Sequence, residues 1–126
     1  MRLLLDTQAL LWWLNDDPRL ANRTRALIAD SRSEVLVSAV SFWELSIKTR
    51  IGKLDDQGSV AMCQVESSRF EIVPIEAIHL EHLERLEPQP GHRDPFDHLI
   101  LIQAIERDAI LVTSDRKLRQ YGVRCL

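Results

Sequence analysis

The chain has 126 residues, of which 45% are apolar and 28% are charged, and its formal net charge is −3. This length and composition predict one soluble globular domain over residues 1–126, large enough to bury a hydrophobic core. They exclude a membrane span, because no stretch approaches the roughly 20 apolar residues that a span needs, and the negative charge argues against broad, sequence-blind binding of phosphate backbones.

The first predicted element is a short strand, Leu3 to Leu5, which is followed by Asp6 and Thr7. An unbroken apolar run of this length is typical of a strand covered on both faces, so we expect it in the middle of a parallel sheet. Met1 and Arg2 lead directly into it without a signal-peptide pattern, which predicts a cytoplasmic protein. Ligands bind at the carboxyl edge of such sheets, and Asp6 is predicted to lie there.

Helical and strand patterns alternate through the rest of the chain. Helices are predicted over residues 7–14, about 18–29, 41–50, 60–67, 75–86, 96–107 and 116–121. Further strands are predicted over residues 35–37, 70–73, 109–112 and 123–125. Strands separated by helices of this length require parallel pairing with right-handed crossovers. The predicted fold is therefore α/β, a three-layer sandwich around a parallel sheet of about five strands.

Four acidic residues fall where a strand passes into a helix or in the first turn of that helix: Asp6, Glu44, Asp97 and Asp115. Each of them taken alone has a structural explanation, because acids cap helix N-termini and suit the positive end of the helix dipole. Ser41 and Glu44 match a capping box, and Asp94 matches an N-cap followed by a proline at the first helical position.

The four acids taken together indicate chemistry. In a parallel sheet all four positions lie at the same edge, so we expect their carboxylates to converge. Carboxylates so close to one another must either raise one another's pKa values or hold a cation. Oxygen ligands without histidine or cysteine suit a hard ion, Mg²⁺ or Mn²⁺. Such a site polarises a phosphodiester and activates water, so the residues predict phosphoryl transfer.

Four segments place these acids among characteristic neighbours: Leu3-Leu4-Leu5-Asp6-Thr7, Ser38-Ala39-Val40-Ser41-Phe42-Trp43-Glu44, His92-Arg93-Asp94-Pro95-Phe96-Asp97 and Leu111-Val112-Thr113-Ser114-Asp115. In this order they resemble PIN-domain ribonucleases, and most closely the VapC toxins of bacterial and archaeal type II toxin-antitoxin pairs. The resemblance covers essentially the whole chain. It implies a magnesium-dependent endoribonuclease that forms a homodimer and is held inactive by a small antitoxin protein.

The resemblance also assigns roles to residues. It implies four catalytic and metal-binding residues: Asp6, Glu44, Asp97 and Asp115. Of these, Asp6 and Asp97 are the expected direct ligands of the ion. The hydroxyls of Thr7 and Ser114 are expected to orient water or ligand. Asp94 is expected to cap its helix. The alternative is that it lies next to Asp97 and supports this metal ligand without binding the ion itself.

Basic residues that flank the acids are candidates for binding RNA: Arg93, Lys48 and Arg116 foremost, with Arg50, Lys53, Lys117 and Arg119 behind them. The alternative is that they are solvated residues on helix faces. Phosphate contacts would make RNA binding weaken steeply with salt.

Histidine is not required by this chemistry. His79 and His82 are three residues apart on a predicted helix rich in glutamate, and we expect them to form an exposed pair. His92 and His98 border Asp94 and Asp97, so they are candidates for contact with substrate.

Two other functions stay open at this point. Asp6 at a strand end suits the phosphate-accepting nucleophile of a phosphatase or phosphotransfer protein, although Asp6-Thr7-Gln8 lacks the second acid, two residues on, of haloacid-dehalogenase-like phosphatases. The second alternative is a non-catalytic module, in which the acids only cap helices and the aromatic surface binds a protein. Whatever the function, the aromatic pairs Trp12-Trp13 and Phe42-Trp43 lie either in the core or, in part, at an interface with a second subunit or an antitoxin.

Overall fold

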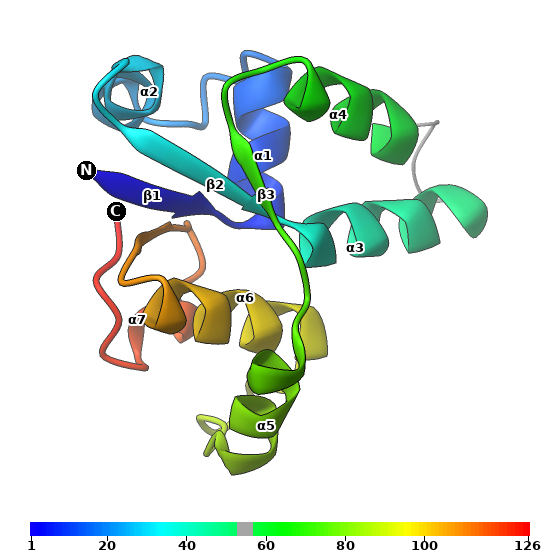
Figure 1. Cartoon of the computed structure of the whole chain (residues 1–126), viewed down its shortest axis with the longest axis vertical. Coiled ribbons are helices and arrows are strands. Elements are labelled where there is room, and N and C mark those ends of the chain that lie inside the picture. Colours follow the sequence, from blue (N-terminus) through cyan, green and yellow to red (C-terminus); the bar gives the residue numbers. More distant parts are fainter. Residues whose placement is uncertain (53–56) are drawn as a thin grey trace.

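A four-stranded parallel sheet lies at the centre of the computed structural model, which describes residues 1–52 and 57–126 (Figure 1). Its strands are β1 (Arg2–Leu5), β2 (Glu34–Ser38), β3 (Glu71–Val73) and β4 (Ile110–Val112), in the order β3-β2-β1-β4. In the register, Leu4 of β1 pairs with Leu36 on one side and with Leu111 on the other. The prediction that the first strand lies inside a parallel sheet is confirmed.

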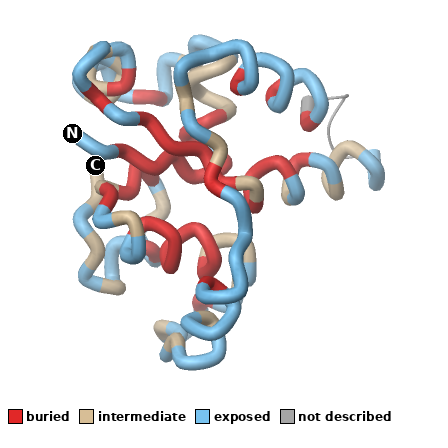
Figure 2. The backbone as a smooth tube through the Cα atoms, viewed as in Figure 1, coloured by how far each residue is buried: buried red, intermediate tan, exposed pale blue. Residues whose placement is uncertain are grey.

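Helices cover both faces of the sheet, which confirms the three-layer α/β fold. They are α1 (Thr7–Leu14), α2 (Asn22–Ala29), α3 (Ala39–Arg50), α4 (Gln57–Glu66), α5 (Ala77–Arg85), α6 (Pro95–Glu106) and α7 (Arg116–Arg119). Because neighbouring residues of a strand point to opposite faces, Leu3 and Leu5 pack with α1, α2 and α4, whereas Leu4 packs with α6 and α7. Figure 2 shows the buried residues running through the sheet and along the inner faces of the helices.

The predicted fifth strand, residues 123–125, is wrong. This segment meets β4 in a single parallel bridge between Leu111 and Cys125. The chain reverses just before it at Gly122, where φ is +74°, a conformation that glycine adopts without a steric penalty. Leu111 N–H donates to the Arg124 carbonyl and Leu126 N–H donates to the Leu111 carbonyl. These contacts form a bridge and not a strand, so the sheet has four strands among the described residues and not about five.

Helices α2 and α4 differ most from the predicted helix starts. Helix α2 begins at Asn22 and not near residue 18. The Asp17 carboxylate accepts a hydrogen bond from the Arg19 backbone N–H, and the Asp17 carbonyl accepts one from Leu20 N–H, which closes a turn that buries Leu20. Helix α4 begins at Gln57 and not at residue 60.

The N-cap of helix α3 lies three residues before the expected one. Ser38, the last residue of β2, is its N-cap, and the Ser38 hydroxyl oxygen accepts a hydrogen bond from Val40 N–H at 3.0 Å. The predicted capping box of Ser41 and Glu44 is therefore wrong, because both residues lie inside the helix. Glu44 projects from the second turn of α3 and has no capping function.

Within residues 1–52 and 57–126, no helix combines the length and the apolar composition needed to cross a membrane.

Candidate active site

The four acids predicted from the sequence line one cavity of about 130 Å³. They reach it from four elements: Asp6 follows β1, Glu44 lies on α3, Asp97 lies in the first turn of α6, and Asp115 follows β4. The other lining residues are Thr7, Gln8, Leu11, Lys48 and Ser114. Among the described lining residues, Lys48 is the one cation. The cavity therefore gathers far more negative than positive charge.

Asp6 is the most deeply buried of the four, with 6% of its surface exposed. It caps α1, as one interpretation of the sequence expected, and its Oδ1 accepts a hydrogen bond from Ala9 N–H at 2.8 Å. Burial raises the pKa of Asp6, hydrogen bonds from Thr113 and Ala9 oppose that rise, and the charges of Asp115 and Glu44 add to it. Capping stabilises this carboxylate only in part, because burial and, to a smaller extent, two further carboxylates act against its charge.

Glu44 is held by two neighbours. The Thr7 hydroxyl donates to Glu44 Oε1 at 2.7 Å, and Lys48 Nζ donates to Glu44 Oε2 at 3.0 Å. The Thr7 oxygen lies 3.0 Å from the hydroxyl of Ser41, one turn before Glu44 on α3. Thr7 thus positions an acid of the cavity, and Lys48 offsets part of its charge.

Asp94 and Asp97 have separate roles at the start of α6. Asp94 is the N-cap, and its Oδ1 accepts hydrogen bonds from Phe96 N–H at 2.9 Å and from Asp97 N–H at 3.4 Å. It does not line the cavity, whereas Asp97 does. Burial raises the pKa of Asp97 from 3.8 to about 6, and the nearby charge of Asp94 adds to the rise, while a hydrogen bond to His92 lowers it. The Asp97 carboxylate is thus costly to ionise in the metal-free cavity.

This raised pKa predicts how stability changes with pH. The folded-state pKa of Asp97, about 6, exceeds its ordinary value of 3.8, so protonated Asp97 favours the folded state. That contribution is complete below about pH 4 and is lost as the pH rises through about 6. For the metal-free protein, we expect the free energy of unfolding in urea to fall over this window relative to that of the Asp97→Asn variant. Equal pH dependence in the two proteins would contradict the assignment.

Asp115 caps the short helix α7, where its Oδ1 accepts a hydrogen bond from Lys117 N–H at 2.9 Å. Its own N–H donates to the hydroxyl oxygen of Thr113 at 3.0 Å, and that hydroxyl is also hydrogen-bonded to Asp6. Ser114 lies exposed at the rim of the cavity. Thr113, which the sequence analysis did not single out, therefore ties two of the acids together. The available signal was its position at the end of a strand, two residues before an acid.

One histidine, His79, differs from its predicted position. His79 is fully buried, so the predicted exposed pair is wrong, although His82 is exposed. His79 faces α6, where its ring contacts Glu106, and its Nδ1 accepts a hydrogen bond from Glu76 N–H at 2.9 Å. His92 is also buried, and its Nε2 lies 3.2 Å from Asp97 Oδ2. The site thus includes a histidine that the predicted chemistry did not require.

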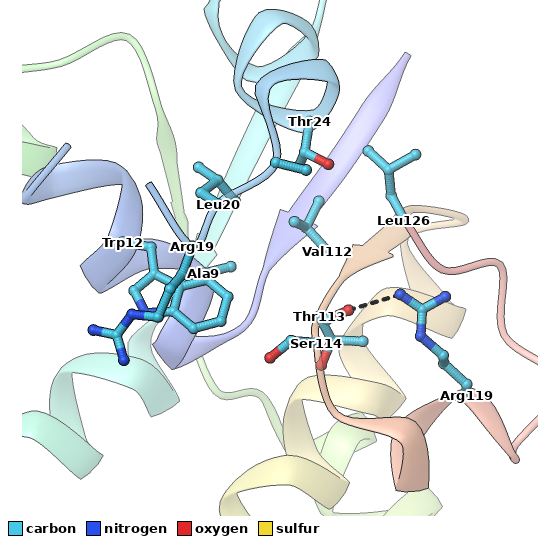
Figure 3. A pocket seen from close by; sticks show the side chains of 11 residues that line it. Ala9, Trp12, Arg19, Leu20, Thr24, Val112, Thr113, Ser114, Arg119 and Leu126 are labelled. Atoms are coloured by element: carbon cyan, nitrogen blue, oxygen red, sulfur yellow. Dashed lines mark hydrogen bonds between the residues drawn. The ribbon is translucent and has the colours of Figure 1, made fainter. Parts of the chain in front are cut away.

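A second pocket, of about 170 Å³, adjoins the acidic cavity and shares Ser114 with it. Figure 3 shows Trp12, Arg19 and Arg119 around this pocket, with Arg119 donating to the Thr113 carbonyl at 3.0 Å. Its walls come from α1, α2 and the segments after β4.

The candidate RNA-binding residues are distributed around the acidic cavity and the second pocket. Arg93 and Arg116 are exposed on the segments that lead into Asp97 and follow Asp115. Lys48 lines the cavity itself. Arg50 is exposed at the end of α3, Lys117 donates to the Gly91 carbonyl at 3.2 Å, and Arg119 faces the second pocket. Lys53 lies outside the described residues.

The aromatic pairs are divided between core and surface. Phe42 is buried, whereas Trp43 is 50% exposed and packs edge-on against Phe96, with ring centroids 4.9 Å apart. Trp12 and Trp13 are half-buried on α1. Trp43 therefore adds an exposed aromatic side chain next to the helix that carries Asp97.

The chemistry of the cavity suits a divalent ion. Its donors are carboxylates, two of which have pKa values raised mainly by burial. A bound cation relieves that penalty, and carboxylate oxygens are the ligands that Mg²⁺ and Mn²⁺ prefer. His92, Asp97 and Asp115 each offer one ligand atom, and these atoms lie within 4.8 Å of one another. The residues present therefore fit a metal ion.

Comparisons with known proteins agree with this arrangement. The PIN domain family model matches residues 3–123. A curated relative, ribonuclease VapC16 of Mycobacterium tuberculosis strain ATCC 25618 / H37Rv, is 51% identical over 41 residues, which are 29% of this chain and 29% of the length of that relative. The chain thus matches less than a third of that protein.

Solved structures match over nearly the whole chain. A chain of VapBC2 from Rickettsia felis, bound to a promoter DNA fragment, matches with a TM-score of 0.75 and 22% identity over 100% of this chain and 98% of that one. M. tuberculosis VapC20, described as a sarcin-ricin-loop-cleaving toxin, matches with a TM-score of 0.68 and 16% identity over 96% and 95%. At these identities the likeness establishes the fold.

Proposed function

The chain belongs to the PIN-domain family, and on that premise we propose that it is a metal-dependent endoribonuclease, the toxin of a VapC-type toxin-antitoxin pair. One observation carries the proposal. Four carboxylates from four separate elements surround one small cavity in which Lys48 is the only cation among the described lining residues. Such a charge imbalance suits a bound divalent ion, which can polarise a phosphodiester and activate water for its hydrolysis.

The proposed ion is Mg²⁺, with Mn²⁺ able to replace it. Asp6 and Asp97 are its proposed direct ligands, and Glu44 and Asp115 complete the acidic quartet around it. When bound, the ion supplies Lewis-acid polarisation of the phosphodiester and activation of water. The Thr7 hydroxyl keeps Glu44 turned into the cavity. Ser114, exposed at the rim, is proposed to orient water or substrate.

The proposed RNA-binding residues are those that put positive charge beside the cavity: Arg93, Arg116 and Lys48. An RNA chain approaching four carboxylates needs cations at the rim, because phosphate and carboxylate repel each other. Arg93 and Arg116 are exposed and supply that charge close to Asp97 and Asp115. Lys48 is already paired with Glu44, so we propose a smaller share for it.

Removing both arginines tests this placement. Arg93→Ala combined with Arg116→Ala is expected to weaken RNA binding. The slope of the logarithm of the binding constant against the logarithm of the salt concentration should become shallower by about 0.7 for each phosphate that these side chains neutralise. Fluorescence anisotropy with labelled single-stranded RNA measures both quantities, in an Asp97→Asn background that keeps the RNA intact. Arg32→Ala is the matched control, because Arg32 is exposed and lies just before β2, at the opposite edge of the sheet. An unchanged salt slope in the double variant would contradict the placement.

The similar solved structures support a protein partner. We propose that a small antitoxin protein blocks the site and that the chain forms a homodimer in the cytoplasm. The similar structure from R. felis is of VapBC2, and the half-exposed Trp43 next to Phe96 offers an apolar contact close to the active site. Light scattering of the purified protein tests the dimer.

The activity itself is tested by incubating the purified protein with RNA in Mg²⁺. Cleavage in Mg²⁺ that stops with excess chelator, together with much slower cleavage of DNA of the same sequence, supports the proposal. Undiminished cleavage in chelator would overturn the role of the metal. The phosphotransfer alternative instead predicts a trapped acyl-phosphate on Asp6.

A further inference from the structure

His92 is a buried histidine whose two ring nitrogens both have close polar neighbours. The residue is 2% exposed. Its Nδ1 lies 2.8 Å from the hydroxyl oxygen of Tyr121, and its Nε2 lies 3.2 Å from Asp97 Oδ2. Whether this ring orients Asp97 or itself binds the ion depends on which nitrogen carries the proton. The hydrogen bonds of the neighbouring residues determine which of the two nitrogens is protonated.

The first constraint comes from Tyr121. Its hydroxyl oxygen accepts a hydrogen bond from the backbone N–H of Gln89 at 2.9 Å. A backbone N–H can only donate, so the direction of this hydrogen bond is fixed. The phenolic proton must then be donated to another acceptor.

The second constraint comes from His98. Its Nε2 lies 3.1 Å from the backbone carbonyl oxygen of His92, and a carbonyl can only accept, so His98 Nε2 carries a proton. The same nitrogen lies 3.4 Å from the Tyr121 hydroxyl and cannot accept the phenolic proton. Within residues 1–52 and 57–126, the acceptor in contact with that proton is Nδ1 of His92.

These two constraints assign the proton of His92. Because Nδ1 accepts from Tyr121, the neutral ring carries its proton on Nε2 and donates it to Asp97 Oδ2. The opposite tautomer would turn a nitrogen lone pair toward the ionised carboxylate of Asp97 and leave the phenolic proton without an acceptor among residues 1–52 and 57–126.

We propose that Tyr121 fixes His92 in the Nε2–H tautomer, so that His92 is a positioning residue that orients Asp97 and stays outside the coordination shell of the metal ion. His92, Asp97 and Asp115 have the spacing of a metal site, but a protonated Nε2 has no lone pair to offer. The shell that remains consists of oxygen atoms, which suits Mg²⁺ or Mn²⁺ better than Zn²⁺. The metal part of the inference rests on the proposed function, whereas the tautomer does not.

The tautomer is tested in the metal-free full-length protein by ¹⁵N NMR of the histidine rings, with the His92 signals identified by their absence from His92→Gln. We expect a protonated Nε2 and an unprotonated Nδ1 near neutral pH. In Tyr121→Phe, Nδ1 loses its donor, so its nitrogen shift is expected to move while that of His79 stays unchanged. A proton on Nδ1 in the wild-type protein would overturn the proposal, whether or not the protein cleaves RNA.

The positioning role is tested by Mn²⁺ affinity, measured from the electron paramagnetic resonance of free Mn²⁺. Glutamine places an amide N–H close to the position of His Nε2, so His92→Gln is expected to bind Mn²⁺ within about threefold of the wild type, whereas His92→Ala should bind about 10- to 100-fold more weakly. Equal, strong losses in both variants would identify His92 as a ligand and overturn the proposal. If His92→Ala does not fold, the Mn²⁺ affinity of His92→Gln alone tests the proposal: an affinity within about threefold of the wild type supports it, and a strong loss overturns it. Failure of the wild-type protein to bind Mn²⁺ would overturn the proposed function and leave the tautomer result standing.

Discussion

Replacing Asp97 or Asp6 by asparagine is expected to lower Mg²⁺-dependent RNA cleavage by more than about 100-fold, which exceeds the 10- to 100-fold cost of losing a residue that only supports a metal ligand. Each substitution removes a charge from the donor set while preserving the size of the side chain. Asparagine still caps a helix, so Asp6→Asn should keep α1 intact. Initial rates on a defined RNA, with circular dichroism to confirm folding, measure the effect.

Asp108→Asn is the matched control for these two variants. Asp108 is exposed, lies outside the cavity and has a φ of 50°, a conformation that asparagine tolerates. We expect this variant to cleave RNA at the wild-type rate. Wild-type cleavage by Asp6→Asn and Asp97→Asn would show that these carboxylates do not bind the catalytic ion.

The second large effect is stabilisation of the fold by the ion. At ten times its dissociation constant, a ligand that binds only the folded state adds about 1.4 kcal/mol to the free energy of unfolding. For a domain of this size that corresponds to a rise of about 5 °C in Tm. We expect Mg²⁺ and Mn²⁺ each to produce such a rise in the wild-type protein, measured by differential scanning calorimetry at constant ionic strength.

The same scan with Asp97→Asn should show a much smaller rise, because one proposed ligand is missing. Sodium chloride at matched ionic strength controls for general screening of the acidic cavity. A protein whose acids only cap helices would show no rise with either divalent ion.

Capping and metal binding are not exclusive in this molecule. Asp6 and Asp115 do cap helices, as we expected for acids at these positions. Each uses Oδ1 to accept the capping hydrogen bond. Glu44 and Asp97 have no such hydrogen bond and still line the cavity. Capping thus explains the position of two acids, but it does not explain why all four meet.

The convergence of the acids was predictable because it follows from topology. A parallel sheet brings all its carboxyl ends to one edge, so recognising the strands before Asp6 and Asp115 sufficed to place both residues. Glu44 was placed in the correct region for a wrong reason. Ser38 and Ser41 are both serines followed by helix-forming residues, and local sequence does not distinguish which of them caps α3.

The contacts around His92 were beyond sequence reasoning. His92 and Tyr121 are 29 residues apart, and their hydrogen bond forms because the loop before α6 packs against the turn after α7. The burial of His79 has the same origin, since the packing of α5 on α6 encloses a residue in a polar local sequence. Periodicity describes one element at a time and carries no record of such contacts.

Anomalous diffraction from crystals grown with Mn²⁺ shows whether this cavity holds a divalent ion. We expect a manganese peak at coordination distance from carboxylate oxygens of Asp6 and Asp97, with no nitrogen of His92 bound to it. Crystals that show Mn²⁺ only elsewhere on the surface, or none at all, would contradict it.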